Sequence, residues 1–364
     1  MDILNVMWGG GSAFVSVHNV HREILRLSGS SSIATLLLTS GEAEPLLDVG
    51  NVSALGFSSK RIKGRGLEAF RRWFDRRRLA KWLSMQELRV VVLDGLGVAS
   101  YLLPLLVEQM SARVIVLFHG NKHPTPAQVR MLQLFPADRL ELVAVSETLA
   151  IDLEHQIGIR VLGGRIALEP SVLRLSLLNR EEALLALGLE GQVRGRIIGA
   201  VGRLVTEKGF DLLLTASSQW LKSHPEDHLV LVGEGPEREN LGALATQLGI
   251  ADQVHLIGHV PTVRRLYRAF DLLCIPSQQE GLGLVLPEAI IAGVPVLATD
   301  LPVFREQLGG SIGLVGAGQR AAWELALSNY LQGDLNTLRD AQQAGMAPER
   351  AWENFIGFYR ELLR

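Results

Sequence analysis

The sequence predicts two doubly wound α/β domains in tandem. Three observations lead to this prediction. Short β-rich apolar runs alternate with longer helical patterns, the alternation restarts halfway along the chain, and a length of 364 residues fits two domains better than one or three. Near-continuous apolar strands separated by helices are typical of parallel sheets covered on both faces. No short repeat recurs, which excludes a solenoid.

The first half contains five apolar runs that we expect to be strands, with helical patterns between them. The strands are expected near residues 3–7, 33–39, 89–94, 113–120 and 140–146, and the helices near 12–28, 66–84, 96–111 and 125–135. We place this first domain at residues 1–165 and a linker at 166–180, where the pattern is least regular.

The second half repeats the arrangement. Strands are expected near residues 195–202, 228–233, 253–258, 271–277 and 294–300, and helices near 208–222, 236–247, 262–269 and 284–292. This second domain spans 181–347. In the last segment, 348–364, Trp352, Phe355 and Tyr359 recur at helical spacing, so we expect an amphipathic helix that packs back toward the first domain.

Composition excludes several classes of protein. The formal net charge is −2, too small for a strongly basic nucleic-acid binder. The single cysteine, Cys274, cannot form an intramolecular disulfide and lies in an apolar run, where we expect it buried. The N-terminus lacks the pattern of a signal peptide, and no run of 18 apolar residues occurs. We expect a cytoplasmic protein. Peripheral association with the inner face of the cytoplasmic membrane is the alternative location.

Ligands of open parallel sheets bind beyond the carboxyl ends of the strands, so the loops after strands should carry the chemistry. If those edges of the two domains face each other, they form a deep cleft. Arg203 and Lys208 flank the turn after the first strand of the second half, and a helix follows. Two cations beside free helix N–H groups suit a phosphate or diphosphate. The alternative is an ordinary surface ion pair, for example between Lys208 and Glu207.

The stretch "SQQEGLGLVLPEA" at residues 277–289 places Glu280 and Glu288 eight positions apart at a loop and a helix start. Acid/base chemistry, a metal site and hydrogen bonds from sugar hydroxyls are the three readings. The acid/base reading would need a water or a scissile atom between the two carboxylates. We expect each glutamate to accept hydrogen bonds from vicinal hydroxyls, one from a ribose and one from a sugar. With the two cations, the pattern describes a nucleotide sugar.

The metal reading would need further ligands. His18 and His21 occupy one expected helix face, and His119 and His123 lie in an expected loop with no acidic third ligand nearby. We therefore predict no metal site and no cofactor.

Several segments resemble a known family. "GRLVTEKGFDLLL", "LVGEGPERENL", the run from Ile257 to Asp300 and the closing helix look like the retaining glycosyltransferases of family 4, which have the GT-B fold. The spacing of Glu280 and Glu288 is that family's signature. The resemblance covers residues 196–315 and 348–364 and is looser in the first half.

The resemblance implies a role for each candidate residue of the second half. Arg203 and Lys208 would bind the donor diphosphate, Glu280 the donor sugar and Glu288 the ribose hydroxyls. The loop would supply backbone N–H groups to sugar and phosphate, and the segment around Val260 would lie along the base. The loop residues are Gly281, Leu282, Gly283 and Leu284.

In the first half, the resemblance implies that Gly10 and Gly11 lie against the donor phosphates and that His119 touches the donor sugar. Phe14 stands where a dinucleotide fingerprint needs glycine, which makes a dehydrogenase a poor reading. Ser146 has a weaker claim to a ligand contact, because it also suits a helix N-cap. Asp94 is a candidate for the acceptor site.

Residues 60–81 hold ten cationic residues with Phe70, Trp73 and Phe74 interleaved. Docking on an anionic membrane surface and a solvated helix with a few anchoring aromatics are equally good readings. Nucleic acid is not expected, since no recognised module accompanies the charge.

Taken together, the sequence predicts a retaining, metal-independent glycosyltransferase. It would move a sugar from a nucleotide sugar to a glycan or lipid-linked glycan, in the synthesis of bacterial envelope polysaccharide or lipopolysaccharide. The alternatives are a nucleotide-sugar epimerase or phosphorylase of the same architecture and a non-catalytic nucleotide-sugar-binding partner.

Overall fold

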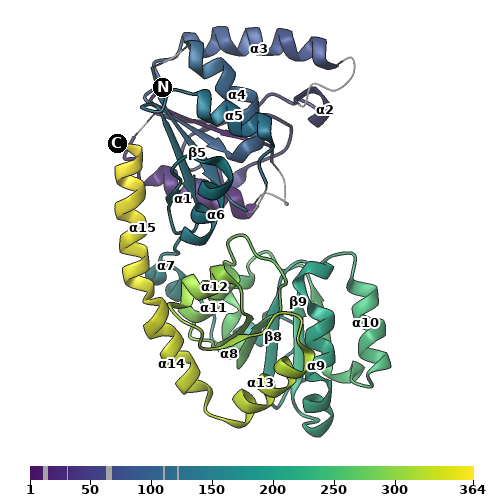
Figure 1. Ribbon diagram of the computed structural model, residues 1–364. Coiled ribbons are helices and arrows are strands. Elements are labelled where there is room, and N and C mark those ends of the chain that lie inside the picture. The colour runs from purple at the N-terminus through teal and green to yellow at the C-terminus, as the bar shows by residue number, and fades with distance from the viewer. Residues whose placement is uncertain (11–14, 31, 63–67, 110, 121–122) are drawn as a thin grey trace. The chain divides into compact units, whose positions relative to one another are not determined.

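The computed structural model describes residues 1–10, 15–30, 32–62, 68–109, 111–120 and 123–364. The chain divides into two compact units (Figure 1). Unit 1 comprises Met1–Ile166 together with Asn354–Arg364, and unit 2 comprises Ala167–Glu353. Each unit is built on one sheet of parallel strands flanked by helices, which confirms the predicted fold class.

The sheet of unit 1 has the strand order β3-β2-β1-β4-β5-β6-β7. The strands are β1 (Ile3–Met7), β2 (Ile33–Leu37), β3 (Asn51–Ala54), β4 (Val90–Asp94), β5 (Arg113–Phe118), β6 (Leu140–Ala144) and β7 (Leu162–Gly163). Every residue of β1 is buried, because the strand lies inside the sheet and its apolar side chains face helices on both sides. In the register of β1 and β2, Asn5 lies beside Thr35.

The helices of unit 1 are α1 (Val15–Arg26), α2 (Ser59–Ile62), α3 (Glu68–Ser84), α4 (Gly95–Gln109), α5 (Pro126–Leu134), α6 (Glu147–Ile157) and the end of α15 (Pro348–Leu363). Helices flank the sheet, while α3 packs on α2 and α4 (Figure 1). Helix α15 is tied to unit 1 by polar contacts: the Tyr359 hydroxyl donates to the Gly164 carbonyl at 2.8 Å, and the Arg113 guanidinium donates to the Leu362 carbonyl at 3.0 Å.

The sheet of unit 2 has the order β10-β9-β8-β11-β12-β13. Its strands are β8 (Ile197–Val201), β9 (His228–Val232), β10 (Val254–Gly258), β11 (Leu272–Ile275), β12 (Val296–Thr299) and β13 (Leu314–Val315). Its helices are α7 (Pro170–Ser176), α8 (Arg180–Ala186), α9 (Phe210–Ser223), α10 (Arg238–Gln247), α11 (Val285–Ile291), α12 (Pro302–Leu308), α13 (Arg320–Gln332) and α14 (Leu335–Met346).

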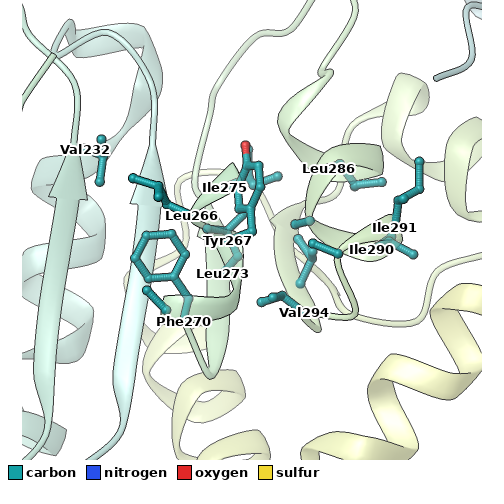
Figure 2. Close-up of a cluster of buried hydrophobic side chains, with 14 of the residues drawn as sticks. Val232, Leu266, Tyr267, Phe270, Leu273, Ile275, Leu286, Ile290, Ile291 and Val294 are labelled. Carbon is teal, nitrogen blue, oxygen red and sulfur yellow. The ribbon is translucent and has the colours of Figure 1, made fainter. Parts of the chain in front are cut away.

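The core of unit 2 has one apolar cluster on each face of the sheet. Side chains alternate along β11: Leu273 and Ile275 join one cluster, while Leu272 and Cys274 join the other. Figure 2 shows the first cluster, where residues of β11 and α11 pack around Tyr267. Cys274 is buried, as predicted.

Some elements differ from the prediction. Residues 262–269, expected as one helix, form two 3-10 turns, Val263–Arg265 and Tyr267–Ala269. The buried residues Leu266, Tyr267, Ala269 and Phe270 are nearly contiguous, which does not match the period of one helical face. Within the expected linker, residues 170–176 form α7, and its Leu173 is buried in the core of unit 2.

Further elements were also not predicted: strands β3, β7 and β13 and helices α2, α6, α8, α12, α13 and α14. Strands β3 and β7 have four and two residues, too short for a clear apolar pattern, and β3 is mostly exposed. Helix α6 follows Ser146 directly. Within the described part of the chain, no helix is both long enough and apolar enough to cross a bilayer.

Candidate functional site

Lys208 and Glu280 form an ion pair at the carboxyl ends of β8 and β11. The Lys208 Nζ lies 2.5 Å from the Glu280 Oε1, and the Ser277 hydroxyl donates to the same oxygen at 2.8 Å. Both ionic side chains are mostly buried, with 25% and 12% of their surface exposed. Lys208 thus pairs with Glu280, in the neighbouring loop, while the alternative weighed from the sequence paired it with Glu207. The two predicted residues therefore belong to one site.

The backbone holds the two loops together. Gly209 ends the 3-10 turn of Lys208 with φ of +66°, and a Cβ at this position would lie 2.3 Å from the Pro276 carbonyl oxygen. The Gln278 N–H donates to the Glu207 carbonyl at 2.8 Å. Only glycine permits both the left-handed backbone and this close approach, so Gly209 sets where the lysine stands relative to the glutamate.

Arg203 lies in the same loop as Lys208, directly after Gly202. A Cβ on Gly202 would lie 3.8 Å from the Lys208 Cδ and Cε, so the lysine chain passes over this glycine. The Arg203 side chain is exposed, and across the described ranges it makes no ion pair or hydrogen bond with the protein. Its guanidinium therefore has five donors for an anion, whereas the charge of Lys208 is already balanced.

Glu288 lies in the first turn of α11 and is held by a buried tyrosine. The Tyr267 hydroxyl donates to the Glu288 Oε2 at 2.8 Å. Burial raises the pKa of Glu288 above its ordinary value, although the nearby Arg264 and the Tyr267 hydrogen bond act in the opposite direction. In Figure 2 the Tyr267 ring stands among apolar side chains, with its hydroxyl pointing away from Phe270. One carboxylate oxygen is thus fixed, and the other makes no hydrogen bond or ion pair within the described residues.

The loop between the two glutamates offers backbone donors. Within the described residues, the N–H groups of Gly281, Leu282, Gly283 and Leu284 donate to no other group of the protein. Gly283 has φ of +56°, and a Cβ there would lie 2.5 Å from the Phe304 ring. The loop is therefore shaped by glycine, and its free N–H groups can bind oxygen atoms of a ligand.

Val260 lies in the loop after β10. Its carbonyl accepts from the Val263 N–H at 3.3 Å, and its side chain packs against the apolar cluster of Figure 2. These contacts explain the local backbone, and the predicted contact with a base stays a prediction.

In unit 1, Gly10 follows β1 and the next residue, Gly11, lies outside the described residues. A Cβ on Gly10 would lie 2.4 Å from the backbone carbon of Gly41, and the Gly10 N–H donates to the Ser40 carbonyl at 3.3 Å. Gly10 is thus required for close packing of two loops. Its predicted contact with phosphate stays a prediction.

Ser146 caps helix α6. Its Oγ accepts from the Leu149 N–H at 3.1 Å, and 5% of the residue is exposed. The capping role weighed from the sequence is therefore present in the structure. A ligand contact by the same hydroxyl stays a prediction.

His119 follows β5 and contacts a second histidine. Its Nε2 lies 2.9 Å from the His21 Nε2 and 3.7 Å from the Asp94 Oδ1. The interpretation that no acid lies near His119 is therefore wrong in space, because β4 and β5 are neighbours whose carboxyl ends meet. The ligand atoms of His21, Asp94 and His119 lie within 4.8 Å of one another, close enough to hold a cation. His123 contacts Gln156 instead, at 3.0 Å.

Burial governs the charge state of both histidines. It lowers the pKa of His119 to about 3. It also holds the pKa of His21 well below its usual range, and the neighbouring His119 and His18 lower that pKa further. Both rings are neutral near pH 7. The site thus presents uncharged imidazoles beside the Asp94 carboxylate.

Sequence reasoning missed four residues of these sites: Asn5, His21, Tyr267 and Ser277. Asn5 was detectable as a polar residue in the middle of the apolar run "ILNVM". Tyr267 lies in a segment expected as a plain helix, where nothing marked its hydroxyl as a partner for Glu288.

Comparisons with known proteins find similarity to glycosyltransferases. The model of the family "Glycosyl transferases group 1" matches residues 191–341. The D-inositol 3-phosphate glycosyltransferase of Segniliparus rotundus is 33% identical over 185 residues, covering 46% of this chain and 40% of that protein. The lipopolysaccharide core biosynthesis mannosyltransferase LpsB of Rhizobium meliloti is 33% identical over 137 residues, covering 36% and 38%. The match thus spans less than half the length of these relatives.

The fold has a wider match. The crystal structure of Anabaena Alr3699/HepE in complex with UDP superposes with a TM-score of 0.78 at 16% identity, covering 100% of this chain and 98% of that one. At this identity the likeness concerns the fold. Residues 191–341 thus match the model of the glycosyl transferases group 1, and the chain has the GT-B fold.

Proposed function

We propose that this chain is a glycosyltransferase that uses a nucleotide-sugar donor. The observation that carries the proposal is the pairing of Lys208 with Glu280 at the carboxyl ends of the strands of unit 2. Beside this pair lies the guanidinium of Arg203, which has no partner among the described residues. Cations suit a diphosphate and carboxylates suit sugar hydroxyls, so a ligand with both groups fits this edge. The relatives named above support the class of reaction.

In the reaction, the bond between the anomeric carbon and the diphosphate oxygen breaks, and a bond from the acceptor oxygen to the same carbon forms. The acceptor's proton passes to the leaving phosphate. Arg203 and Lys208 stabilise the negative charge that develops on that phosphate, and this is where electrostatic catalysis has most effect. The N–H groups of residues 281–284 add neutral donors to sugar and phosphate.

Glu280 and Glu288 bind hydroxyls in this proposal. Glu280 is held by Lys208 and Ser277 through the same oxygen, so its second oxygen can accept from the donor sugar. Glu288 is held by Tyr267 and accepts from the ribose. Val260 lies along the base. A carboxylate fixed by a lysine is a weak nucleophile, which supports retention by front-face attack without a covalent sugar–enzyme intermediate.

Unit 1 contributes through Gly10, Gly11, His119 and Ser146. We place the glycines against the donor phosphates and His119 against the donor sugar. Ser146 combines its capping role with a ligand contact. The reaction proceeds without a metal, because two cationic side chains supply the charge that a divalent ion would bring.

The acceptor is a glycan or lipid-linked glycan of a bacterial envelope, as the relationship to LpsB supports. Helix α3 supports docking on an anionic membrane surface, because Phe70, Trp73 and Phe74 are exposed beside a run of arginines. Sedimentation with liposomes should show binding to anionic but not to neutral vesicles. Serine at these three positions should abolish it, and equal partitioning to both vesicle types would contradict the docking role.

A thermal-shift panel of UDP-, GDP-, ADP- and dTDP-sugars tests the donor. One nucleotide sugar should raise the melting temperature through ligand linkage. Arg203→Ala should abolish that shift, whereas Arg320→Ala, which removes an exposed arginine paired with Glu324, should leave it intact. Shifts that survive Arg203→Ala would contradict the proposed diphosphate site.

Turnover of the identified donor then decides the class. Transfer to an acceptor, with the anomeric configuration kept and with full activity in EDTA, supports the proposal. Conversion of the donor without an acceptor would indicate an epimerase, and dependence on inorganic phosphate would indicate a phosphorylase. Binding without any turnover would indicate a non-catalytic partner.

A further inference from the structure

A chain of hydrogen-bonded polar side chains runs through the apolar interior of unit 1. It begins at Thr35 on β2, continues through Asn5 on β1 and His21 on α1, and ends at His119 after β5. The Asn5 Nδ2 lies 3.2 Å from the Thr35 Oγ1, the His21 Nδ1 lies 2.7 Å from the Asn5 Oδ1, and the two histidine Nε2 atoms are 2.9 Å apart. Thr35, Asn5 and His21 are at most 2% exposed. Apolar residues would fill these positions at lower desolvation cost, so the chain calls for a functional reason.

The distances fix the orientation of the Asn5 amide. An N–H···O bond of 3.2 Å to Thr35 is ordinary, whereas an O–H···O bond of that length would be long. The 2.7 Å contact to His21 suits an oxygen at the Asn5 end, since a nitrogen there would be crowded. The carbonyl oxygen of Asn5 therefore faces His21. An oxygen can only accept, so the His21 Nδ1 carries the hydrogen.

The remaining hydrogens follow in order. His21 is neutral because it is buried, so its Nε2 has a lone pair and accepts from His119. The Nε2 of His119 must then carry the hydrogen. The Asp94 carboxylate, with Oδ1 3.7 Å from that nitrogen, favours the same assignment electrostatically. A neutral His119 with its hydrogen on Nε2 has an unprotonated Nδ1.

That Nδ1 is buried and accepts no hydrogen bond within the described residues. A buried acceptor without a donor destabilises the folded chain, because it has given up its hydrogen bonds to water. A ligand hydroxyl is the chemical class of donor that would satisfy it. This step depends on the proposed function, in which His119 meets the donor sugar, whereas the assignment of the hydrogens does not.

The distance between the two histidine nitrogens is that of a hydrogen bond. It is shorter than the distance between two nitrogens that bind the same metal ion. Two nitrogens bound to one zinc at about 2.0–2.1 Å in a tetrahedral site lie roughly 3.3 Å apart. The observed separation is 2.9 Å. The geometry therefore favours a shared proton over a shared cation.

We propose that Asn5 and His21 are positioning residues that hold His119 in the tautomer with hydrogen on Nε2, so that its Nδ1 accepts a hydrogen bond from a hydroxyl of the ligand. Thr35 anchors the far end by fixing the Asn5 amide.

Long-range ¹H–¹⁵N correlation spectra of the ¹⁵N-histidine-labelled, ligand-free chain read the tautomers directly. His119 should be protonated on Nε2 and His21 on Nδ1. Substitutions of each histidine by glutamine assign the signals among the nine histidines. The pair His228 and His255, whose nitrogens are also 2.9 Å apart but lie in unit 2, is the internal control. A His119 protonated on Nδ1 would overturn the proposal.

Variants test the control over His119. Asn5→Leu removes the acceptor, so a second His119 tautomer should appear, while Asn5→Asp keeps an acceptor and should keep the single tautomer. The signals of His228 and His255 should not change in either variant. An unchanged His119 in Asn5→Leu would overturn the proposal. If Asn5→Leu fails to fold, Thr35→Val, which keeps the shape of the side chain and releases the amide, gives the same readout.

Two further measurements connect the tautomer with function. Asn5→Leu should raise the KM for the donor about 5- to 10-fold, as expected for one lost hydrogen bond, with a smaller effect on kcat. An unchanged KM together with an altered tautomer would contradict the ligand contact and leave the transferase itself standing. Zinc that binds at equimolar amounts and shifts both Nε2 signals would overturn the proposal in favour of a cation site.

Discussion

Lys208 and Glu280 neutralise each other at 2.5 Å across two neighbouring loops of unit 2, and a diphosphate must compete with this pair. Glu280→Gln removes the competing charge. The variant should therefore bind a nucleoside diphosphate at least as tightly as the wild type, while transfer slows because the sugar loses its acceptor. Lys208→Ala should weaken the same binding about 10- to 100-fold, as expected for a lost charged contact.

Calorimetry with the nucleoside diphosphate, beside rate measurements with the intact donor, separates these effects. Lys208→Ala/Glu280→Gln should resemble Lys208→Ala in affinity. If Glu280→Gln weakened the binding as much as Lys208→Ala does, the two side chains would act as a structural pair and not as a phosphate site.

Glu288 should make stability depend on pH in a defined direction. Its pKa is raised in the folded chain, mainly by burial, so the folded state holds the proton more tightly than the unfolded state does. Relative to Glu288→Gln, the wild type should gain stability at acidic pH and lose it as pH rises through the folded pKa. Urea unfolding of both proteins between pH 4 and 8 measures the difference. A difference with the opposite slope would show that Arg264 and the Tyr267 hydrogen bond outweigh the burial of Glu288.

Gly283 should not tolerate a side chain. Its φ of +56° strains any other residue, and a Cβ would lie 2.5 Å from the Phe304 ring. Gly283→Ala should lower the free energy of unfolding by roughly 2–4 kcal/mol. Gly310→Ala is the matched control, because a Cβ there meets nothing within 4 Å and the backbone is not left-handed. Tryptophan fluorescence, to which the buried Trp323 of unit 2 contributes, follows the unfolding.

His119 should make unit 1 sensitive to acid. Burial lowers its pKa to about 3, so between pH 6.5 and 3 the unfolded state binds the proton and the folded state does not. Stability should fall with pH in this window, by up to about 1.4 kcal/mol per pH unit. His119→Gln should be less sensitive, while His123→Gln, at an exposed histidine, should behave like the wild type. Equal acid sensitivity of all three proteins would show that His119 protonates freely.

The sequence was most informative where the physics is local. The apolar runs of β1, β5 and β9 predicted their strands, since buried parallel strands need continuous apolar residues. Arg203, Lys208, Glu280 and Glu288 were identified because each stands after a strand or at a helix start. The partners of these residues were not, because a hydrogen bond between Tyr267 and Glu288 leaves no spacing signal across 21 positions.

The histidines show the same limit. His21 and His119 are 98 positions apart and meet because α1 packs beside the end of β5. In the sequence, His21 was grouped with His18 and His119 with His123, because these histidines are close along the chain. A polar Asn5 inside an apolar strand was the one available hint, and interpreting it requires the strand order.

Gly209 seats its loop directly on the Pro276 carbonyl, and the Gln278 N–H fastens the loop after β11 to the same segment. Movement of either loop would break the backbone contacts that join the two loops. The two loops are therefore already in their binding conformation before a ligand arrives at these strand ends. Any retuning of its sugar preference during evolution would have to come from exchanging side chains, since insertions or deletions in these loops would dislodge Lys208 and Glu280 together.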